Sequence, residues 1–171
     1  MKPRIETLKF MKLVGIPMKM SLAENKTAEL WQRFMPGRSE VKNRVNTDFI
    51  SMQIYGEDWT FSPDAQFEKW AAVEVSTFSE IPANMETYML QGGKYAVFIH
   101  KGPAGNAAQI MQWIFGKWLP DSEYLLDSRE HFERLPENYR PQDTEATEEI
   151  WIPVKDKVMI KESRLFDSCS I

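Results

Sequence analysis

A carboxylate and an indole two residues apart are the side chains of this chain best suited to chemistry. They are Glu149 and Trp151, in the stretch EEIWIPV at residues 148–154. Neighbouring side chains of a β-strand point to opposite faces, so these two share one face, and Glu148 lies with the aliphatic residues on the other. A glutamate is rarely buried without a partner. Glu149 is therefore expected either at a solvated rim or beside a partner from outside the chain.

Other aromatic residues could line a site together with Glu149 and Trp151. Tyr55 ends the stretch DFISMQIYG at residues 48–56, where polar and aromatic residues share one face. Trp59 follows in a turn, and Trp113 and Phe115 lie beside the apolar stripe of a predicted helix. Each ring facing a cation would add about 0.5–2 kcal/mol of cation–π attraction. Each ring also has an ordinary alternative, which is a place in the core or on the wet side of a sheet.

The composition allows a packed domain and argues against several classes of partner. The chain has 171 residues, of which 43% are hydrophobic and 12% aromatic, so it can form one domain or two small modules sharing a core. The formal net charge of -4 argues against nucleic acid, because phosphate binding requires a basic face. No stretch approaches the ~20 apolar residues that span a bilayer. We therefore expect neither a nucleic-acid partner nor a membrane.

Cysteine, histidine and motif content predict a cytoplasmic protein without a cofactor. The single cysteine, Cys169, cannot form an internal disulfide, which suits a reducing compartment. His100 and His131 have no Cys or Asp ligands at metal spacing. No phosphate-binding loop, dinucleotide-binding turn or nucleophile elbow occurs. We therefore expect no metal and no cofactor.

The order of segments repeats between the two halves of the chain. In each half an alternating stretch leads through Gly and Pro into a helical pattern, and two further extended stretches follow. These stretches lie at residues 7–17, 22–35, 48–56 and 69–76 and again at 92–103, 104–119, 123–133 and 148–154. The pattern predicts an α+β fold of tandem pseudo-symmetric β-α-β-β modules with antiparallel sheets and a central ligand cleft.

The predicted boundaries follow from the same repeat. The first module covers about residues 5–79 and the second about 80–155, so that residues 1–155 form the binding domain. Residues 81–91 form a bridging extended segment. Residues 156–171 form a C-terminal extension whose structure the sequence does not decide.

Three stretches together resemble the GyrI-like small-molecule-binding family. They are GGKYAVFIHKGP, the amphipathic helix after it, and EEIWIPVK. This family includes the effector-binding domain of AraC- and MerR-type multidrug regulators, and the likeness covers about residues 5–155. It implies two modules around a cleft that binds hydrophobic, often cationic, aromatic compounds through stacked rings and a glutamate on the last strand. Glu149 matches that glutamate. Compared with those regulators, we expect a domain without a preceding DNA-binding segment and with a tail after it.

The resemblance implies a stand-alone effector-binding protein that captures a hydrophobic, cationic or aromatic compound, for transcription regulation or drug sequestration. It also implies an alternative, since some members hydrolyse strained electrophilic natural products. In that case Glu149 would activate a water and Tyr55 would orient it or donate a proton. A third alternative is a protein that only contacts another protein. The sequence does not separate binding from hydrolysis, or a monomer from a homodimer.

Overall fold

The computed structural model describes residues 2–60 and 62–157 of the chain. The C-terminal extension expected from residue 156 therefore lies outside the described residues, except for Asp156 and Lys157. Cys169 lies outside them as well.

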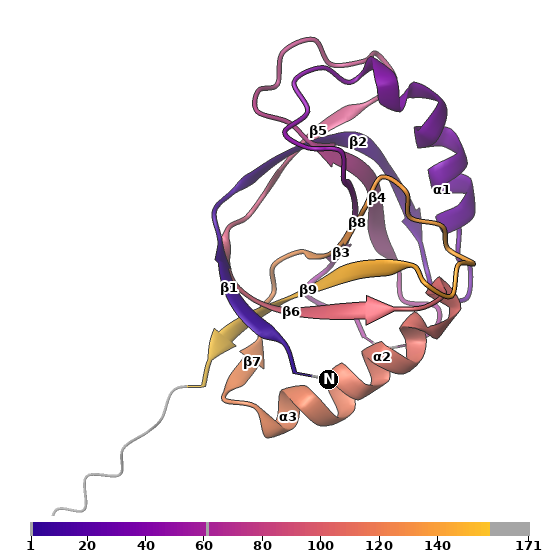
Figure 1. Ribbon diagram of the computed structural model, residues 1–171. Helices are drawn as coiled ribbons and strands as arrows, with labels where there is room; N and C mark the ends of the chain where they lie inside the picture. Colours follow the sequence, from indigo (N-terminus) through magenta and orange to yellow (C-terminus); the bar gives the residue numbers. More distant parts are fainter. Residues whose placement is uncertain (1, 61, 158–171) are drawn as a thin grey trace, which may run out of the picture.

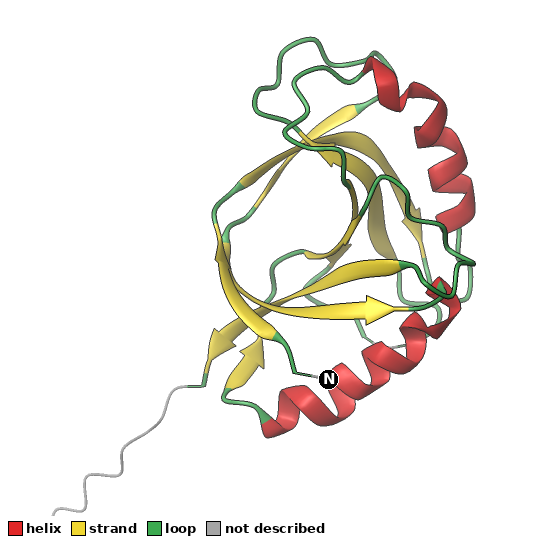
Figure 2. Ribbon diagram, in the orientation of Figure 1, coloured by secondary structure: helices red, strands yellow, loops and turns green. Residues whose placement is uncertain are grey.

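Helical segments interrupt the strands at two places along the described chain (Figure 2). Helix α1 continues into a 3-10 turn at Met35–Glu40, and a π-helical turn at Ile114–Trp118 joins α2 to α3. The elements in chain order are β1 (Arg4–Leu8), β2 (Met11–Met20), α1 (Thr27–Phe34), β3 (Phe49–Tyr55), β4 (Phe67–Glu74), β5 (Glu86–Leu90), β6 (Gly93–Lys101), α2 (Ala107–Trp113), α3 (Leu119–Asp121), β7 (Tyr124–Leu126), β8 (His131–Leu135) and β9 (Thr147–Asp156).

The α+β fold of two β-α-β-β units predicted from the sequence is confirmed. The first unit is β2-α1-β3-β4 and the second is β6-α2-β8-β9, and β3 pairs with β8 between them. All the strand pairs are antiparallel. The registers of the units match, because Trp70 of β4 pairs with Met52 and Pro17, and Trp151 of β9 pairs with Phe132 and Val97.

The strands curl into a closed ring, which Figure 1 shows along its axis. The strand order is β1-β6-β9-β8-β3-β4-β2-β5, with β7 beside β9. Only Lys9 and Phe10 separate β1 from β2, and only Gln91 and Gly92 separate β5 from β6. The register is unchanged across these bends, since Leu8 pairs with Gly93 and Met11 with Leu90. The two ends of the strand order thus belong to one pair of long bent strands.

Side chains of alternate strand residues fill the interior of the ring. This interior cluster is aliphatic and aromatic, and Phe132 stacks on Trp151 with ring centroids 5.1 Å apart. Its buried members are Met11, Leu13, Ile50, Met52, Trp70, Ala72, Leu90, Tyr95, Val97, Phe132 and Trp151. Because these residues pack on one another, the opening in the ribbon drawing is a core and not a channel.

The helices α1 and α2 lie outside the ring (Figure 1). Leu30 and Phe34, one turn apart on α1, are buried against a cluster of the first unit that includes Phe49 and Val73. The residues of α2 and the π-helical turn cover a cluster of the second unit that includes Phe98 and Ile150. Each unit therefore buries the outer face of its strands under its own helix.

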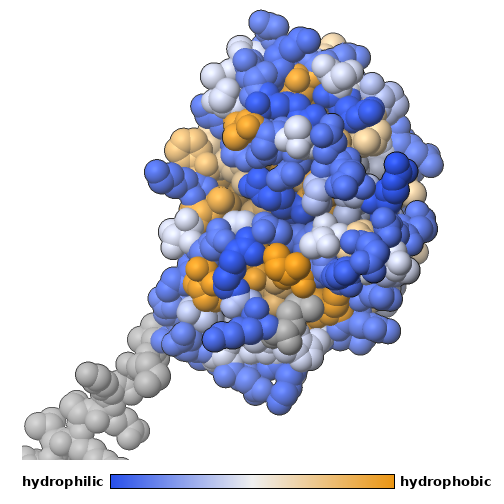
Figure 3. Space-filling model, in the orientation of Figure 1, coloured by the Kyte–Doolittle hydropathy of each residue, from blue (hydrophilic) through white to orange (hydrophobic). Residues whose placement is uncertain are grey.

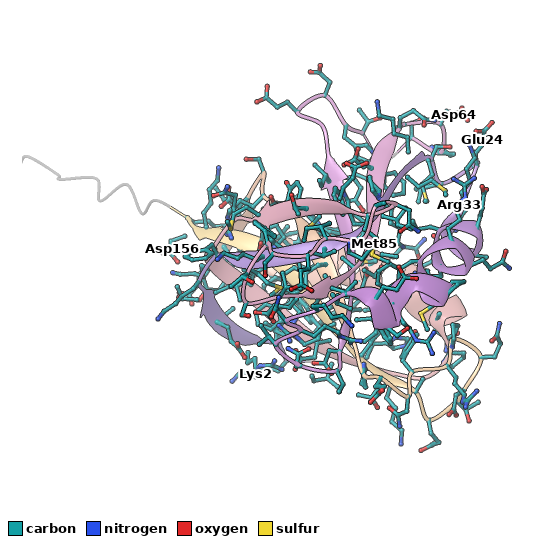
Figure 4. All side chains as sticks on the ribbon, turned by 90° about the horizontal axis from the view of Figure 1, so that it is seen from above. Lys2, Glu24, Arg33, Asp64, Met85 and Asp156 are labelled. Carbon is teal, nitrogen blue, oxygen red and sulfur yellow. The ribbon has the colours of Figure 1, made fainter. Side chains whose placement is uncertain are left out.

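Charged side chains lie at the periphery, as the labelled Lys2, Glu24, Arg33 and Asp156 illustrate (Figure 4). Met85, in contrast, points inward and is 6% exposed. The surface seen in Figure 3 is mainly hydrophilic, with hydrophobic residues in separate groups. Within the described residues, none of the helices combines the length and apolar character that crossing a bilayer requires.

Candidate functional site

A polar seam separates the two helix-covered clusters on the outer face of the sheet. It consists of Ser51 and Gln53 of β3 and of Glu133 and His131 of β8, which lie opposite each other as Ser51–Glu133 and Gln53–His131. Ser51, Gln53 and His131 are buried, and Glu133 is half-buried. Since apolar clusters flank the seam on both sides, polar groups in the middle of a sheet indicate a function other than packing.

Glu133 carries the charge of the polar seam. The Gln53 amide Nε2 donates to the two Glu133 carboxylate oxygens at 2.9 and 3.3 Å. Among the described residues no lysine, arginine or histidine forms an ion pair with this carboxylate. Lys69 lies directly across β4 from Gln53, but its ammonium forms no ion pair in the described part of the chain. Within the described residues, the Glu133 carboxylate thus has a hydrogen-bond donor but no cationic partner.

Aromatic rings border the polar seam. The ring of Tyr55 lies 4.2 Å from that of Trp59 and 4.9 Å from the imidazole of His131, between ring centroids. The ring of Phe115 lies 6.0 Å from that imidazole. Burial and the nearby Glu133 carboxylate raise the pKa of Tyr55, so its phenol stays protonated at neutral pH. Burial lowers the pKa of His131 to about 4, so its imidazole stays neutral.

A second acid lies at one end of the seam. Glu148 is 6% exposed, and its carboxylate Oε1 lies 2.7 Å from Nδ1 of the buried His100. Burial comes first among the causes that raise the pKa of Tyr139, followed by the charge of Glu148 and a hydrogen bond to it. The charge of Glu133 also contributes to that pKa. Tyr139 therefore lies close to both acids of the outer face.

Glu149 has partners within the chain. Its Oε1 accepts a hydrogen bond from the Arg4 guanidinium at 2.6 Å, and its Oε2 accepts one from the Trp151 indole at 3.0 Å. The Glu149 side chain is 28% exposed, and the Arg4 side chain 41%. From the sequence, a solvated rim or a partner from outside the chain is expected, whereas the structure gives the partly exposed Glu149 a partner within the chain, Arg4 of β1. That strand is far from β9 in sequence, so no local pattern reveals the pair.

The structure places the predicted site residues on two different faces of the sheet. Tyr55, Trp59 and Phe115 gather on the outer face, whereas Trp151 packs in the interior cluster and Glu149 points to the same side as Trp151. Strand alternation imposes this separation. The idea that all of them line one cleft is therefore wrong. The hydrolase pairing of Glu149 with Tyr55 loses its geometric basis for the same reason.

Trp113 occupies a third position. It packs in the cluster under α2, with its ring 6.2 Å from that of Phe98.

Sequence reasoning missed Glu133 as a candidate, because residues 123–133 do not alternate clearly and β8 begins only at His131. The alternation of β8 was the signal available, since His131, Glu133 and Leu135 share one face.

A small hollow borders the strand end at which Glu149 lies. It measures about 270 Å³ and is open to solvent. Its lining mixes charges of both signs with apolar side chains, and comprises Asp48, Ile99, Arg134, Pro136, Thr147, Glu148 and Glu149. Glu149 thus lies beside a recess, with its carboxylate already held by Arg4.

Comparison with known proteins agrees with a domain of this fold that binds small molecules. The model of the GyrI-like small molecule binding domain matches residues 1–155. The chain therefore belongs to the GyrI-like family. The transcriptional regulator BrlR of Pseudomonas aeruginosa is 27% identical over 143 residues, which are 83% of this chain and 51% of BrlR. The chain thus spans about half the length of this curated relative.

Solved structures share the fold at low sequence identity. SAV2435 bound to tetraphenylphosphonium aligns with a TM-score of 0.70 and 22% identity, over 91% of this chain and 94% of that one. The C-terminal domain of EcmrR aligns with a TM-score of 0.66 and 15% identity, over 91% of this chain and 98% of that one. The chain thus shares the fold of these domains.

Proposed function

We propose that the domain captures a hydrophobic organic cation on the outer face, over the polar seam and between α1 and α2. Glu133 supplies the counter-charge, and Tyr55, Trp59 and Phe115 supply ring contacts. The observation that carries the proposal is the Glu133 carboxylate, which is half-buried among aromatic rings and has no cationic partner within the described residues. A carboxylate removed from bulk water attracts a cation more strongly than an exposed one.

Two relatives support the ligand class and the wider role. SAV2435 has been solved with tetraphenylphosphonium, a lipophilic cation, and BrlR is a transcriptional regulator. We propose that binding of such a compound serves transcription regulation or drug sequestration in this protein as well. We do not propose the hydrolase alternative, because its acid, Glu149, and its tyrosine, Tyr55, lie on opposite faces of the sheet.

The role of Glu133 as counter-ion is tested in two ways: by replacing the glutamate with glutamine, and by replacing the cationic ligand with a neutral one. We expect Glu133→Gln to weaken binding of tetraphenylphosphonium by about tenfold or more, which is about 1.4 kcal/mol. Binding of neutral triphenylphosphine oxide should change less than about twofold, because only the cation interacts with the lost charge. Isothermal titration calorimetry measures both affinities.

Glu149→Gln is the matched control, because it makes the same chemical change on the opposite face. It should change the affinity for tetraphenylphosphonium by less than about twofold. The sequence-based expectation makes the opposite prediction, in which Glu149 is the counter-ion. A larger loss in Glu149→Gln than in Glu133→Gln would therefore refute the site proposed on the outer face.

A further inference from the structure

Gln53 holds an unsatisfied acceptor at the centre of the polar seam. Its side chain is 5% exposed. The Nε2 atom donates to Glu133 at 2.9 Å, and Ser51 Oγ lies 3.5 Å away. The carbonyl Oε1 is buried and has no hydrogen-bond partner in the described part of the chain. Buried polar atoms of folded proteins are nearly always satisfied, so this oxygen requires an explanation.

The orientation of the Gln53 amide is fixed by its neighbour. A carboxylate is an acceptor only, so the amide must turn its NH₂ group towards Glu133. Rotating the amide would bring its carbonyl oxygen against the carboxylate oxygens and remove both contacts. In this orientation Oε1 stays without a donor from the described residues.

We propose that the natural ligand is a protonated primary or secondary amine on an aromatic body, with N–H groups that bond Gln53 Oε1 and the Glu133 carboxylate. This inference rests on the proposed function and narrows its ligand class. A phosphonium or quaternary ammonium ion offers charge but no N–H donor, so it would leave Oε1 unsatisfied. The carbonyl is already out of water in the folded protein, and a donor that reaches it gains a hydrogen bond without further desolvation of the acceptor.

The surroundings of Gln53 restrict which donor can satisfy it. His131 is directly opposite on β8, and Lys69 is directly opposite on β4. Burial keeps His131 neutral at physiological pH, because its pKa is lowered to about 4. The Lys69 side chain is half-buried and makes no hydrogen bond or ion pair in the part of the chain that the structure describes. Among the described residues, Lys69 is thus one internal rival to a ligand, beside the single N–H of the neutral His131 imidazole, and Lys69 enters the test.

The test compares two cations with the same ring system. The probes are 1-naphthylmethylammonium and (1-naphthylmethyl)trimethylammonium, titrated calorimetrically into the wild-type chain at pH 7.5, with tetraphenylphosphonium as a third ligand. We expect the primary ammonium to bind about tenfold or more tightly than its trimethylated analogue. In Gln53→Met this ratio should fall about fivefold or more, because the Oε1 acceptor is gone, while the Glu133 carboxylate can still accept a hydrogen bond from the primary ammonium. Gln66→Met makes the same change at an exposed position and should keep the wild-type ratio.

The outcomes separate the two proposals. Equal affinities for the two naphthyl cations in wild type, or the unchanged wild-type ratio in Gln53→Met, would overturn the inference and leave the proposed function standing. If none of the three cations binds, the proposed function itself fails. A preference for the primary ammonium that appears only in Lys69→Met would show that Lys69 satisfies Gln53, which also overturns the inference. Should Gln53→Met not fold, Gln53→Asn replaces it and is expected to reduce the ratio, since it retracts the carbonyl.

Discussion

The charge of the polar seam is set by four residues at neutral pH. Glu133 is a carboxylate without an ion-pair partner among the described residues, and the phenol of Tyr55 stays protonated because burial and Glu133 raise its pKa. The phenol of Tyr139 stays protonated for similar reasons. His131 stays neutral because burial lowers its pKa. The seam therefore combines a carboxylate with hydroxyl donors and rings, a combination that favours a cation with an apolar body.

His131 should make the stability of the domain depend on pH. Its pKa is about 4 in the folded state, against 6.5 as the ordinary value. Between these pH values the unfolded chain binds more protons than the folded one. The contribution of His131 to the free energy of unfolding is therefore fully present above pH 6.5 and is lost as the pH falls towards 4. At pH 5 the loss from this residue is about 2 kcal/mol. Urea unfolding should show wild type losing that much more than His131→Gln between pH 7.5 and 5. Parallel losses in the two proteins would contradict the assignment.

At the scale of elements, the alternation of side chains along strands could be predicted, but the side that the helices cover could not. The stretch 148–154 correctly separates Glu149 and Trp151 from Glu148 and the aliphatic residues. Nothing local to β9 shows that the aliphatic face is the outer one, or that Arg4 reaches Glu149 from β1. β8 was unclear because it is only five residues long. Its Glu133 becomes a candidate only once β3 lies beside it.

The same carboxylate–indole pair occurs in both units, with one difference. In β4 the Trp70 indole donates to Glu68 at 2.8 Å, and in β9 the Trp151 indole donates to Glu149 at 3.0 Å. Only the second pair has an arginine partner among the described residues. Arg4 therefore ties β1 to β9 in addition to the pairing of β1 with β6.

A double-mutant cycle measures what the Arg4–Glu149 ion pair contributes to stability. We expect Arg4→Met and Glu149→Gln to couple by about 0.5–1 kcal/mol in urea unfolding, because both side chains are partly exposed. The coupling should decrease at about 1 M salt, where charges are screened within a few ångströms. A coupling of zero, or one that salt leaves unchanged, would show that the pair is not an effective link between these strands.

At the scale of the whole molecule, the ring closes where two bent strands cross. Gly92 lies at this crossing, and a Cβ on it would lie 2.7 Å from the backbone oxygen of Leu8 and 2.9 Å from the backbone nitrogen of Phe10. Backbone atoms cannot move aside as the end of a flexible side chain can. The glycine is therefore required by close approach of the two strands. Both units share the interior cluster, so strain at this point should lower the stability of the whole domain.

Gly92→Ala should consequently destabilise the protein by about 2–3 kcal/mol. The control is Gly116→Ala, because a Cβ on this helical glycine meets no atom within 4 Å. That change should be neutral or stabilise by roughly 0.5–1 kcal/mol. Urea unfolding tests both variants with two probes. Tryptophan fluorescence includes signals from Trp31 of the first unit and Trp118 of the second, and far-ultraviolet circular dichroism follows the secondary structure. We expect one coincident transition at lower urea in Gly92→Ala, because the ring unfolds as a unit. Separate transitions for the two probes, or an unchanged midpoint, would show that closure at Gly92 does not couple the two units.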